Sequence, residues 1–280
     1  MSAPRISFEF FPPRSLEASF KLWETIKMLA PLQPGFVSVT YGAGGTTRQL
    51  THEAVKAINS AFGLNVAAHL TCVDATREET LEIAQSYYDA GVREIVVLRG
   101  DAPKGAERFT PHPEGFADSA ELIAALAATG KFDLRVGAYP ERHPDAADDK
   151  ADVRWLKRKF EAGATSALTQ FFFEAETFLR FRDDCAAEGI SGLIIPGILP
   201  IENWGGAKRF AARCNAAVPD WMDEKFTAAE AAGTQDELSV ELSVKLCEKL
   251  MAEGVEDLHF YTLNKPHLTL QVCEGLGIKA

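Results

Sequence analysis

The stretch "RISFEFFPPRS", residues 5–15, decides between the two α/β folds open to this chain. Its first half has the composition of a β-strand, and the two prolines end that strand because proline cannot continue a ladder. A doubly wound sheet would usually carry a glycine-rich turn after its first strand, and this turn contains no glycine. The alternative is a closed barrel of parallel strands, which requires strands and helices to alternate along the chain.

Strand-like runs do alternate with helical patterns along the whole sequence. A helix is predicted to begin after Ser15, a good N-cap, and another after Thr76, which forms a capping box with Glu79. The first four strands start about 30 residues apart, the length of one βα unit. The eight predicted strands are 5–10, 35–41, 65–72, 94–100, 134–140, 167–173, 192–198 and 257–263.

Eight such units predict a single α/β domain over residues 1–280, a (β/α)₈ TIM barrel. The segment between strands seven and eight is long. It is expected to hold a helix at 203–215, an irregular insert at 218–233 and a helix at 236–253. An extra C-terminal helix is predicted at 266–276.

Bulk composition excludes several classes of function. The net charge of −11 argues against a nucleic-acid-binding surface, which needs a basic stripe. The sequence contains no run of 18 apolar residues, so no membrane span is expected, and no signal segment is recognised at the N-terminus. The five cysteines form no CxxC pair, so we expect reduced thiols in a cytoplasmic protein.

Strand parity predicts where a site would lie. Alternate residues of a barrel strand face the interior, and the catalytic groups of TIM barrels sit at the C-terminal strand ends. Most strands carry polar side chains there, opposite their aliphatic residues, which predicts a polar-lined cup. The residues assigned to the inner face are Ser7, Glu9, Ser38, Thr40, Ala67, His69, Thr71, Val97, Arg99, Asp101, Gly137, Tyr139, Leu168, Gln170, Phe172, His259 and Tyr261.

Glu9 stands between phenylalanines at the end of the first strand. Burial raises the pKa of a carboxyl group, and a neutral carboxylic acid can donate a proton at pH 7. The alternative is that Glu9 simply pairs with a lysine or arginine. No metal-ligand spacing, GxSxG elbow, GxGxxG or GxxxxGK[ST] motif occurs. The residues alone therefore predict a barrel enzyme with a buried acid and leave its chemistry open.

Nine motifs, in order and across nearly the whole chain, resemble methylenetetrahydrofolate reductases of the short bacterial type. They are "SFEFFPPR" (7–14), "FVSVTYGAGG" (36–45), "HLTC" (69–72), "VLRGD" (97–101), "AYPERHP" (138–144), "LKRKFEAGA" (156–164), "TQFFFE" (169–174), "IIPGILPI" (194–201) and "LHFYTLN" (258–264).

The resemblance implies a FAD-containing barrel that passes a hydride from NADH or NADPH to flavin N5. The reduced flavin then reduces 5,10-methylenetetrahydrofolate to 5-methyltetrahydrofolate, with ping-pong kinetics. It also implies a role in one-carbon metabolism and methionine biosynthesis, in the cytoplasm. A folate substrate, a homo-oligomer and no metal are expected.

The resemblance also assigns roles to residues. Glu9 matches the general acid, and Asp101 matches an aspartate that faces flavin and pterin. Arg158 and Lys159 match contacts to the FAD diphosphate, although "LKRKF" (156–160) alone would indicate a solvated helix face. The remaining predicted FAD contacts are Thr40, His69, Leu98, Arg99, Gly100, Asp101, Tyr139, His143 and Asp152. The predicted folate contacts are Glu9, Gln170, Phe226, Tyr261 and Lys265.

Three other interpretations remain open at this point. The chain could be another flavin-dependent barrel oxidoreductase, such as a proline-dehydrogenase-like enzyme. It could bind folate or flavin without turning either over. A non-enzymatic scaffold is the third, and it leaves the polar cup unexplained.

Overall fold

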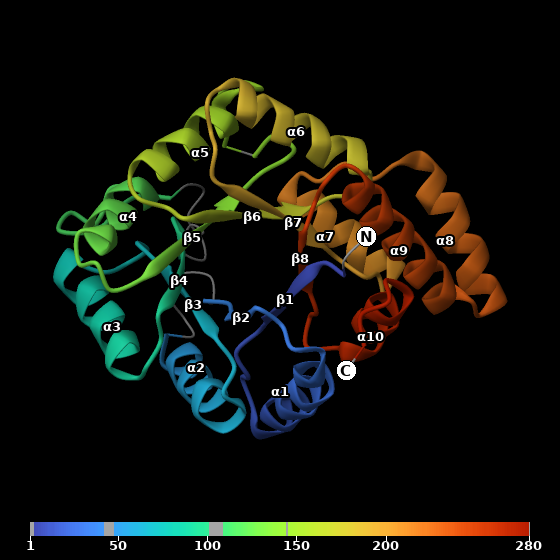
Figure 1. Ribbon diagram of the computed structural model, residues 1–280, viewed down its shortest axis with the longest axis horizontal. Helices are drawn as coiled ribbons and strands as arrows, with labels where there is room; N and C mark the ends of the chain where they lie inside the picture. Colours follow the sequence, from blue (N-terminus) through green and yellow to red (C-terminus); the bar gives the residue numbers. More distant parts are fainter. Residues whose placement is uncertain (1–2, 42–47, 101–108, 144, 280) are drawn as a thin grey trace.

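The strands of this chain close into one parallel barrel, as the sequence predicted (Figure 1). The computed structural model describes residues 3–41, 48–100, 109–143 and 145–279. Within these ranges the strands are paired in chain order, and β8 pairs with β1 to close the ring. They are β1 (Arg5–Phe10), β2 (Phe36–Val39), β3 (Val66–Thr71), β4 (Glu94–Leu98), β5 (Asp133–Ala138), β6 (Ser166–Phe171), β7 (Leu193–Ile198) and β8 (Asp257–Tyr261).

Helices surround this ring of strands (Figure 1). Ser15 caps the first helix, and Thr76 and Glu79 form the predicted capping box. The predicted C-terminal helix is present and packs against α1 and α9. The helices are α1 (Leu16–Leu29), α2 (Arg48–Phe62), α3 (Arg77–Asp89), α4 (Ser119–Ala127), α5 (Ala151–Glu161), α6 (Ala175–Ala187), α7 (Trp204–Cys214), α8 (Asp220–Ala232), α9 (Gln235–Ala252) and α10 (Pro266–Gly275), with a 3₁₀ turn at Ala30–Leu32.

The insert at 218–233, predicted to be irregular, is largely the helix α8. Pro219 precedes its first residue, acidic residues occupy its first turn, and Gly233 ends it in the left-handed conformation. Met222, Phe226 and Ala229 recur about one turn apart and are buried. This apolar stripe packs the helix against α7 and α9, which explains why the segment is ordered.

Alternation along the strands separates two apolar layers. Phe8 and Phe10 pack outward, between the barrel and its helices, so Ser7 and Glu9 point inward. A separate small cluster fills the barrel interior beneath the polar cup. Its members are Phe36, Ala67, Val96, Leu168 and Ile195, with Leu98 packed against them.

The predicted parity was wrong for the fourth strand. Val97 packs outward among the helices, whereas Val96 and Leu98 face the interior. The prediction extended the strand through Arg99, but β4 ends at Leu98 and the backbone turns at Gly100, where φ is +89°. A Cβ at Gly100 would lie 2.5 Å from Val73 Cγ2, so this turn requires glycine. The turn changes the direction in which Arg99 points.

The five cysteines are all free thiols, as expected. No helix in the part of the chain that the structure describes is both long and apolar enough to cross a membrane.

Gly197 allows β6, β7 and β8 to approach closely at the end of the barrel that carries the polar cup. A Cβ at this position would lie 2.3 Å from the Thr169 carbonyl oxygen and 2.5 Å from the Tyr261 ring. The Tyr261 hydroxyl donates a hydrogen bond of 2.7 Å to the same carbonyl. Gly197 therefore fixes the position of Tyr261 as well as the strand packing.

Gly197→Ala is expected to lower the free energy of unfolding by about 1–3 kcal/mol, because neither a strand backbone nor a buried ring can move freely. Urea unfolding measures the change. Gly205→Ala on α7 is the matched control: its nearest atom would be 3.5 Å away, so its stability should stay the same or rise. Equal unfolding energies for the two variants would contradict this account of the packing.

Candidate active site at the carboxyl ends of the strands

Glu9 lies at the centre of a polar cluster inside the barrel. Its Oε2 atom is 3.4 Å from His69 Nε2 on β3 and 3.8 Å from His259 Nε2 on β8. The Ser38 hydroxyl on β2 donates to the same oxygen at 3.5 Å. The Glu9 side chain is largely buried, with 13% of its surface exposed. Four strands thus bring their polar side chains to one carboxylate.

The structure corrects the predicted ionisation of Glu9. Burial raises the pKa of its carboxyl, as expected, but the interactions with His259 and His69 outweigh burial and lower the pKa to about 2. Glu9 is therefore a carboxylate at pH 7 in the ligand-free protein. The alternative considered from the sequence, a lysine or arginine partner, was also wrong, since the partners are two imidazoles.

Ser7 controls which proton His259 presents to Glu9. The Ser7 Oγ and His259 Nδ1 atoms are 2.8 Å apart, and the same hydroxyl lies 3.3 Å from the Leu258 carbonyl oxygen. If Ser7 donates to Nδ1, the proton of neutral His259 is on Nε2 and faces the Glu9 carboxylate. If Ser7 instead donates to Leu258, its oxygen accepts from Nδ1–H, and Nε2 can share a proton with Glu9. One buried hydroxyl thus serves both protonation states.

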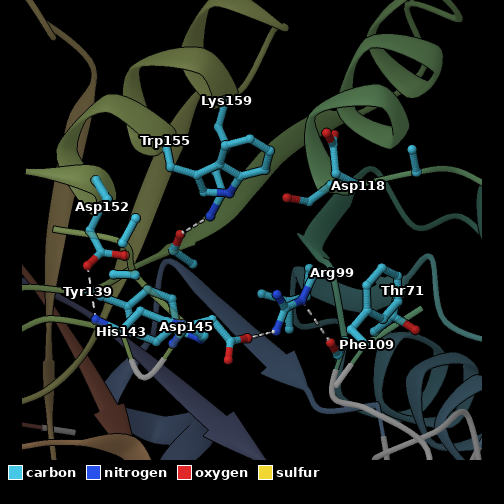
Figure 2. A pocket seen from close by; sticks show the side chains of 18 of the residues that line it. Thr71, Arg99, Phe109, Asp118, Tyr139, His143, Asp145, Asp152, Trp155 and Lys159 are labelled. Atoms are coloured by element: carbon cyan, nitrogen blue, oxygen red, sulfur yellow. Dashed lines mark hydrogen bonds and ion pairs between the residues drawn. The ribbon is translucent and has the colours of Figure 1, made fainter. Parts of the chain in front are cut away.

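A cavity of about 500 Å³ opens over the ends of β3, β4 and β5 (Figure 2). Thr71, two residues after His69 on the same face of β3, lies in its wall and connects it to the Glu9 cluster. The rings of Tyr139 and His143 meet edge to face at 4.4 Å. The predicted cofactor contacts that line the cavity are Leu98, Arg99, Gly100, Tyr139, His143, Asp152 and Lys159.

The cations of this cavity are held by specific partners. Arg99 donates to Asp145 at 2.8 Å, and Lys159 Nζ donates to the Gly137 carbonyl at 2.6 Å (Figure 2). Burial lowers the pKa of Lys159 to about 8. Arg158 is further out, 3.2 Å from Asp118 at the start of α4. Two cations thus line one cavity, and a third is at its edge.

Asp152 and His143 are joined at the opposite wall. The Asp152 carboxylate accepts the His143 backbone N–H at 2.9 Å. Burial raises the pKa of Asp152 and lowers the pKa of His143, so it favours the neutral form of both side chains. The pair anchors the 139–143 loop to α5.

The other predicted site residues do not lie together. His69 is in the Glu9 cluster, and Thr40 donates its backbone N–H to Phe10 at the end of β1. Gln170 accepts a hydrogen bond from the Phe171 backbone, and Lys265 pairs with Glu202 near the rim. Asp101 and residues 42–45 of the glycine-containing motif lie outside the described residues.

Phe226 is not brought to the site. Its side chain is fully buried and stacks on Trp204 with ring centroids 4.6 Å apart, between α7 and α8. The resemblance assigns Phe226 to the substrate because it aligns with an aromatic that stacks on substrate in the family. In the ligand-free structure it belongs to α8 and packs between helices. In this structure it has no free face for a substrate ring.

Trp155, which the resemblance also assigns to the flavin side, lies in the cavity wall, and the Arg158 guanidinium is 4.8 Å from its ring centroid. The sequence does not predict three other residues of the wall, Asp145, Phe109 and Asp118. They come from loops and a helix start, for which neither parity nor spacing gives a position.

A closed (β/α)₈ barrel with a carboxylate and a cofactor-sized cavity at the carboxyl ends of its strands defines the class of TIM-barrel enzymes. Among the described residues, no group of three or more His, Cys, Asp or Glu side chains could hold a metal ion. The sequence profile described as methylenetetrahydrofolate reductase matches residues 2–277. The chain therefore belongs to the methylenetetrahydrofolate reductase family.

Curated relatives agree over almost the full length. The 5,10-methylenetetrahydrofolate reductase of Salmonella typhimurium is 46% identical over 98% of this chain and 91% of its own length. The Escherichia coli enzyme of the same name is 45% identical over the same shares. The chain is also 32% identical to methylenetetrahydrofolate reductase (NADH) 1 of Arabidopsis thaliana, of which it covers 48%.

Solved structures support the barrel fold. An uncharacterised Clostridium thermocellum protein, which binds two copies of 5-methyl-5,6,7,8-tetrahydrofolic acid, superposes with a TM-score of 0.60 at 12% identity. The match covers 99% of this chain and 96% of that protein. A 2,3-dimethylmalate lyase superposes with a TM-score of 0.54 at 10% identity, covering 97% of this chain and 79% of the lyase. At sequence identities this low, the similarity shows a shared fold and nothing more.

If Lys159 contacts a diphosphate, as the sequence resemblance implies, the affinity of the cavity for that group should depend on pH. Adenosine diphosphate should then bind less tightly as the pH rises through about 8, because Lys159 loses its proton. The affinity should fall by up to tenfold per pH unit above that point, measured by titration calorimetry. Lys159→Met should bind weakly and without this pH dependence. A wild-type affinity that stays constant from pH 7 to 9.5 would contradict the prediction.

Proposed function

We propose that this chain is a FAD-dependent reductase that converts 5,10-methylenetetrahydrofolate to 5-methyltetrahydrofolate with NADH or NADPH. The observation that carries the proposal is the Glu9 carboxylate, set between two imidazoles beside a cavity lined with cations. The names of its relatives support the folate substrate. We further propose ping-pong kinetics, a cytoplasmic homo-oligomer, and a place in one-carbon metabolism that supplies methionine biosynthesis.

The residues of the cavity fit a flavin dinucleotide. Its volume of about 500 Å³ is within the range of cofactor sites, and it is both aromatic and cationic. Arg99 and Lys159 would hold the diphosphate, with Arg158 at the edge; binding would require Arg99 to exchange Asp145 for a phosphate oxygen. Tyr139 and His143 would pack against the ring system. A bound flavin supplies hydride transfer between the nicotinamide and the folate.

Glu9 would supply the proton that the folate requires. The methylene bridge accepts a hydride poorly until a ring nitrogen is protonated and the five-membered ring opens to an iminium ion. Folate binding would cover the exposed part of Glu9 and exclude water, which raises the carboxyl pKa from its low ligand-free value. The carboxyl could then take up a proton and donate it to the substrate nitrogen.

The neighbouring groups would orient the pterin. Gln170 uses its Oε1 atom for the Phe171 backbone, which leaves its amide protons available to a ligand. The Tyr261 hydroxyl is committed to Thr169, so its ring would act as a wall. Asp101, from the sequence resemblance, would hydrogen-bond the amino-pyrimidine edge and stabilise the iminium charge.

The test is anaerobic stopped-flow spectroscopy of the purified flavin-loaded protein. In wild type, NADH or NADPH should bleach the yellow flavin, and methylenetetrahydrofolate should restore it. Glu9→Gln should keep the first half-reaction and slow the second by about 10²–10⁴-fold, the usual range for loss of a general acid.

Glu17→Gln on the exposed side of α1 is the control and should match wild type in both half-reactions. Equal folate rates in Glu9→Gln and wild type would remove Glu9 from its proposed role. Flavin reduction by proline instead of a nicotinamide would favour the proline-dehydrogenase-like alternative. Binding without any flavin reoxidation would favour the binding-only barrel.

A further inference from the structure

Three side chains stack across the barrel interior and end at the Glu9 cluster. The Arg135 guanidinium of β5 lies 3.8 Å from the centroid of the Phe36 ring on β2. The ring of His259 on β8 also stacks on Phe36, with centroids 5.6 Å apart and the ring planes inclined by only 11°. His259 in turn faces Glu9. The stack therefore links a fixed cation on the barrel floor to the partner of the proposed acid.

Arg135 is held rigidly in this position. Its Nε donates to the Glu94 carboxylate at 2.6 Å, and its Nη1 donates to the Ser166 hydroxyl at 2.9 Å. Asn65 donates to the other Glu94 oxygen. The side chains of Arg135 and Glu94 are 16% and 10% exposed, so water screens this charge weakly.

Several charged and titratable groups act on His259. Burial is the largest influence and lowers its pKa; Glu9 raises it, and His69 and Arg135 lower it further. Tyr261 meets the ring edge to face at 5.4 Å, and its own pKa is raised by burial. Glu94 acts indirectly, as the counter-ion of Arg135. From β6 and β7 the interior neighbours are Leu168, Ile195 and Gly197, which do not titrate.

We propose that Arg135, stacked on Phe36, is a positioning residue that adds to the effect of burial and favours the neutral form of the His259 imidazole. A cationic His259 would form an ion pair with Glu9 and hold the proton on the wrong side of the carboxylate. When Glu9 takes up a proton, a neutral His259 whose Nε2 carries no hydrogen accepts a hydrogen bond from the carboxyl group and leaves the proton on Glu9, where a substrate can take it. The charge state of His259 is a property of the ligand-free chain; its catalytic consequence rests on the proposed function.

A purely structural role for Arg135 makes a different prediction. The Arg135–Glu94 pair also closes the barrel floor. If its role were only structural, Arg135 and Glu94 variants would both loosen the floor and would change stability and activity in the same direction. An electrostatic role requires opposite effects from opposite charges. Removing the cation should raise the pKa of His259, and removing the counter-ion Glu94 should lower it.

The experiment is an NMR titration of the histidine ring nitrogens in the full ligand-free chain, with the His259 signal identified from its loss in His259→Gln. Arg135→Met combined with Glu94→Gln removes both charges and leaves no buried charge unpaired. Glu94→Gln alone should lower the pKa of His259 relative to wild type. The double variant should have a His259 pKa about half to one unit above that of Glu94→Gln, because these two variants differ only in the cation at position 135. Arg135→Lys, which keeps the cation, should stay near wild type.

The second readout is the pH profile of the folate half-reaction. Its basic limb should lie at higher pH in the double variant than in Glu94→Gln. Equal pKa values of His259 in these two variants, or a pKa in Glu94→Gln that is not below that of wild type, would overturn the proposal. If the double variant does not fold, Glu94→Gln and Arg135→Lys still decide it, since only the first should change the pKa.

The two proposals can fail separately. The expected differences in the His259 pKa without any folate turnover in wild type would retain the electrostatic role of Arg135 and reject the proposed reductase. Folate turnover that responds to Glu9→Gln, without those differences at His259, would retain the reductase and reject the role of Arg135.

Discussion

A single carboxylate between two imidazoles, Glu9 with His69 and His259, is the constraint on which the rest of this site depends. Each group alone would be expensive to bury, because an uncompensated charge or an unpaired nitrogen loses its hydration. In this cluster the two imidazoles lie close enough to the carboxylate to stabilise its charge. Within the described residues, neither histidine Nε2 has a hydrogen-bond partner, so both are oriented towards Glu9 with no other group competing for them. A site of this kind can gain or release a proton with little change in structure.

The barrel supplies this cluster through its topology. Residues far apart in sequence become neighbours because β1 pairs with both β2 and β8, and β3 lies next to β2. Ser7 and Glu9 share one face of β1, so the same strand carries both the acid and the hydroxyl that orients His259. Gly197 lets the neighbouring strands close around Tyr261. The apolar cluster below excludes water from the floor, which keeps the electrostatic interactions strong.

Much of the fold followed from local sequence patterns, and several features of the site did not. The eight strands were predicted to within a few residues, because strand composition and turn residues are local signals. The inward direction of Glu9 and His259 followed from alternation along their strands. Helix α8 was not predicted, because the segment was interpreted as an irregular insert. The helical spacing of Met222, Phe226 and Ala229 was nevertheless present in the sequence. The burial of Phe226 against Trp204 likewise follows from the packing of this helix.

The protonation state of Glu9 could not be predicted from the sequence, because it depends on residues that meet only in the folded barrel. The sequence showed a carboxyl between aromatic residues, which alone indicates a raised pKa. The opposing influence comes from His69 and His259, which lie about 60 and 250 residues away and meet Glu9 only when the barrel closes. The link from Arg135 to His259 depends in the same way on three strands and on the angle of a ring stack.

Infrared difference spectroscopy tests the central claim most directly. At pH 7, folate added to the flavin-loaded protein should produce the carbonyl band of a newly protonated carboxylic acid. The band should be missing from Glu9→Gln under the same conditions. A wild-type spectrum without such a band, or the same band in the variant, would contradict the account that Glu9 takes up the proton when its substrate covers it.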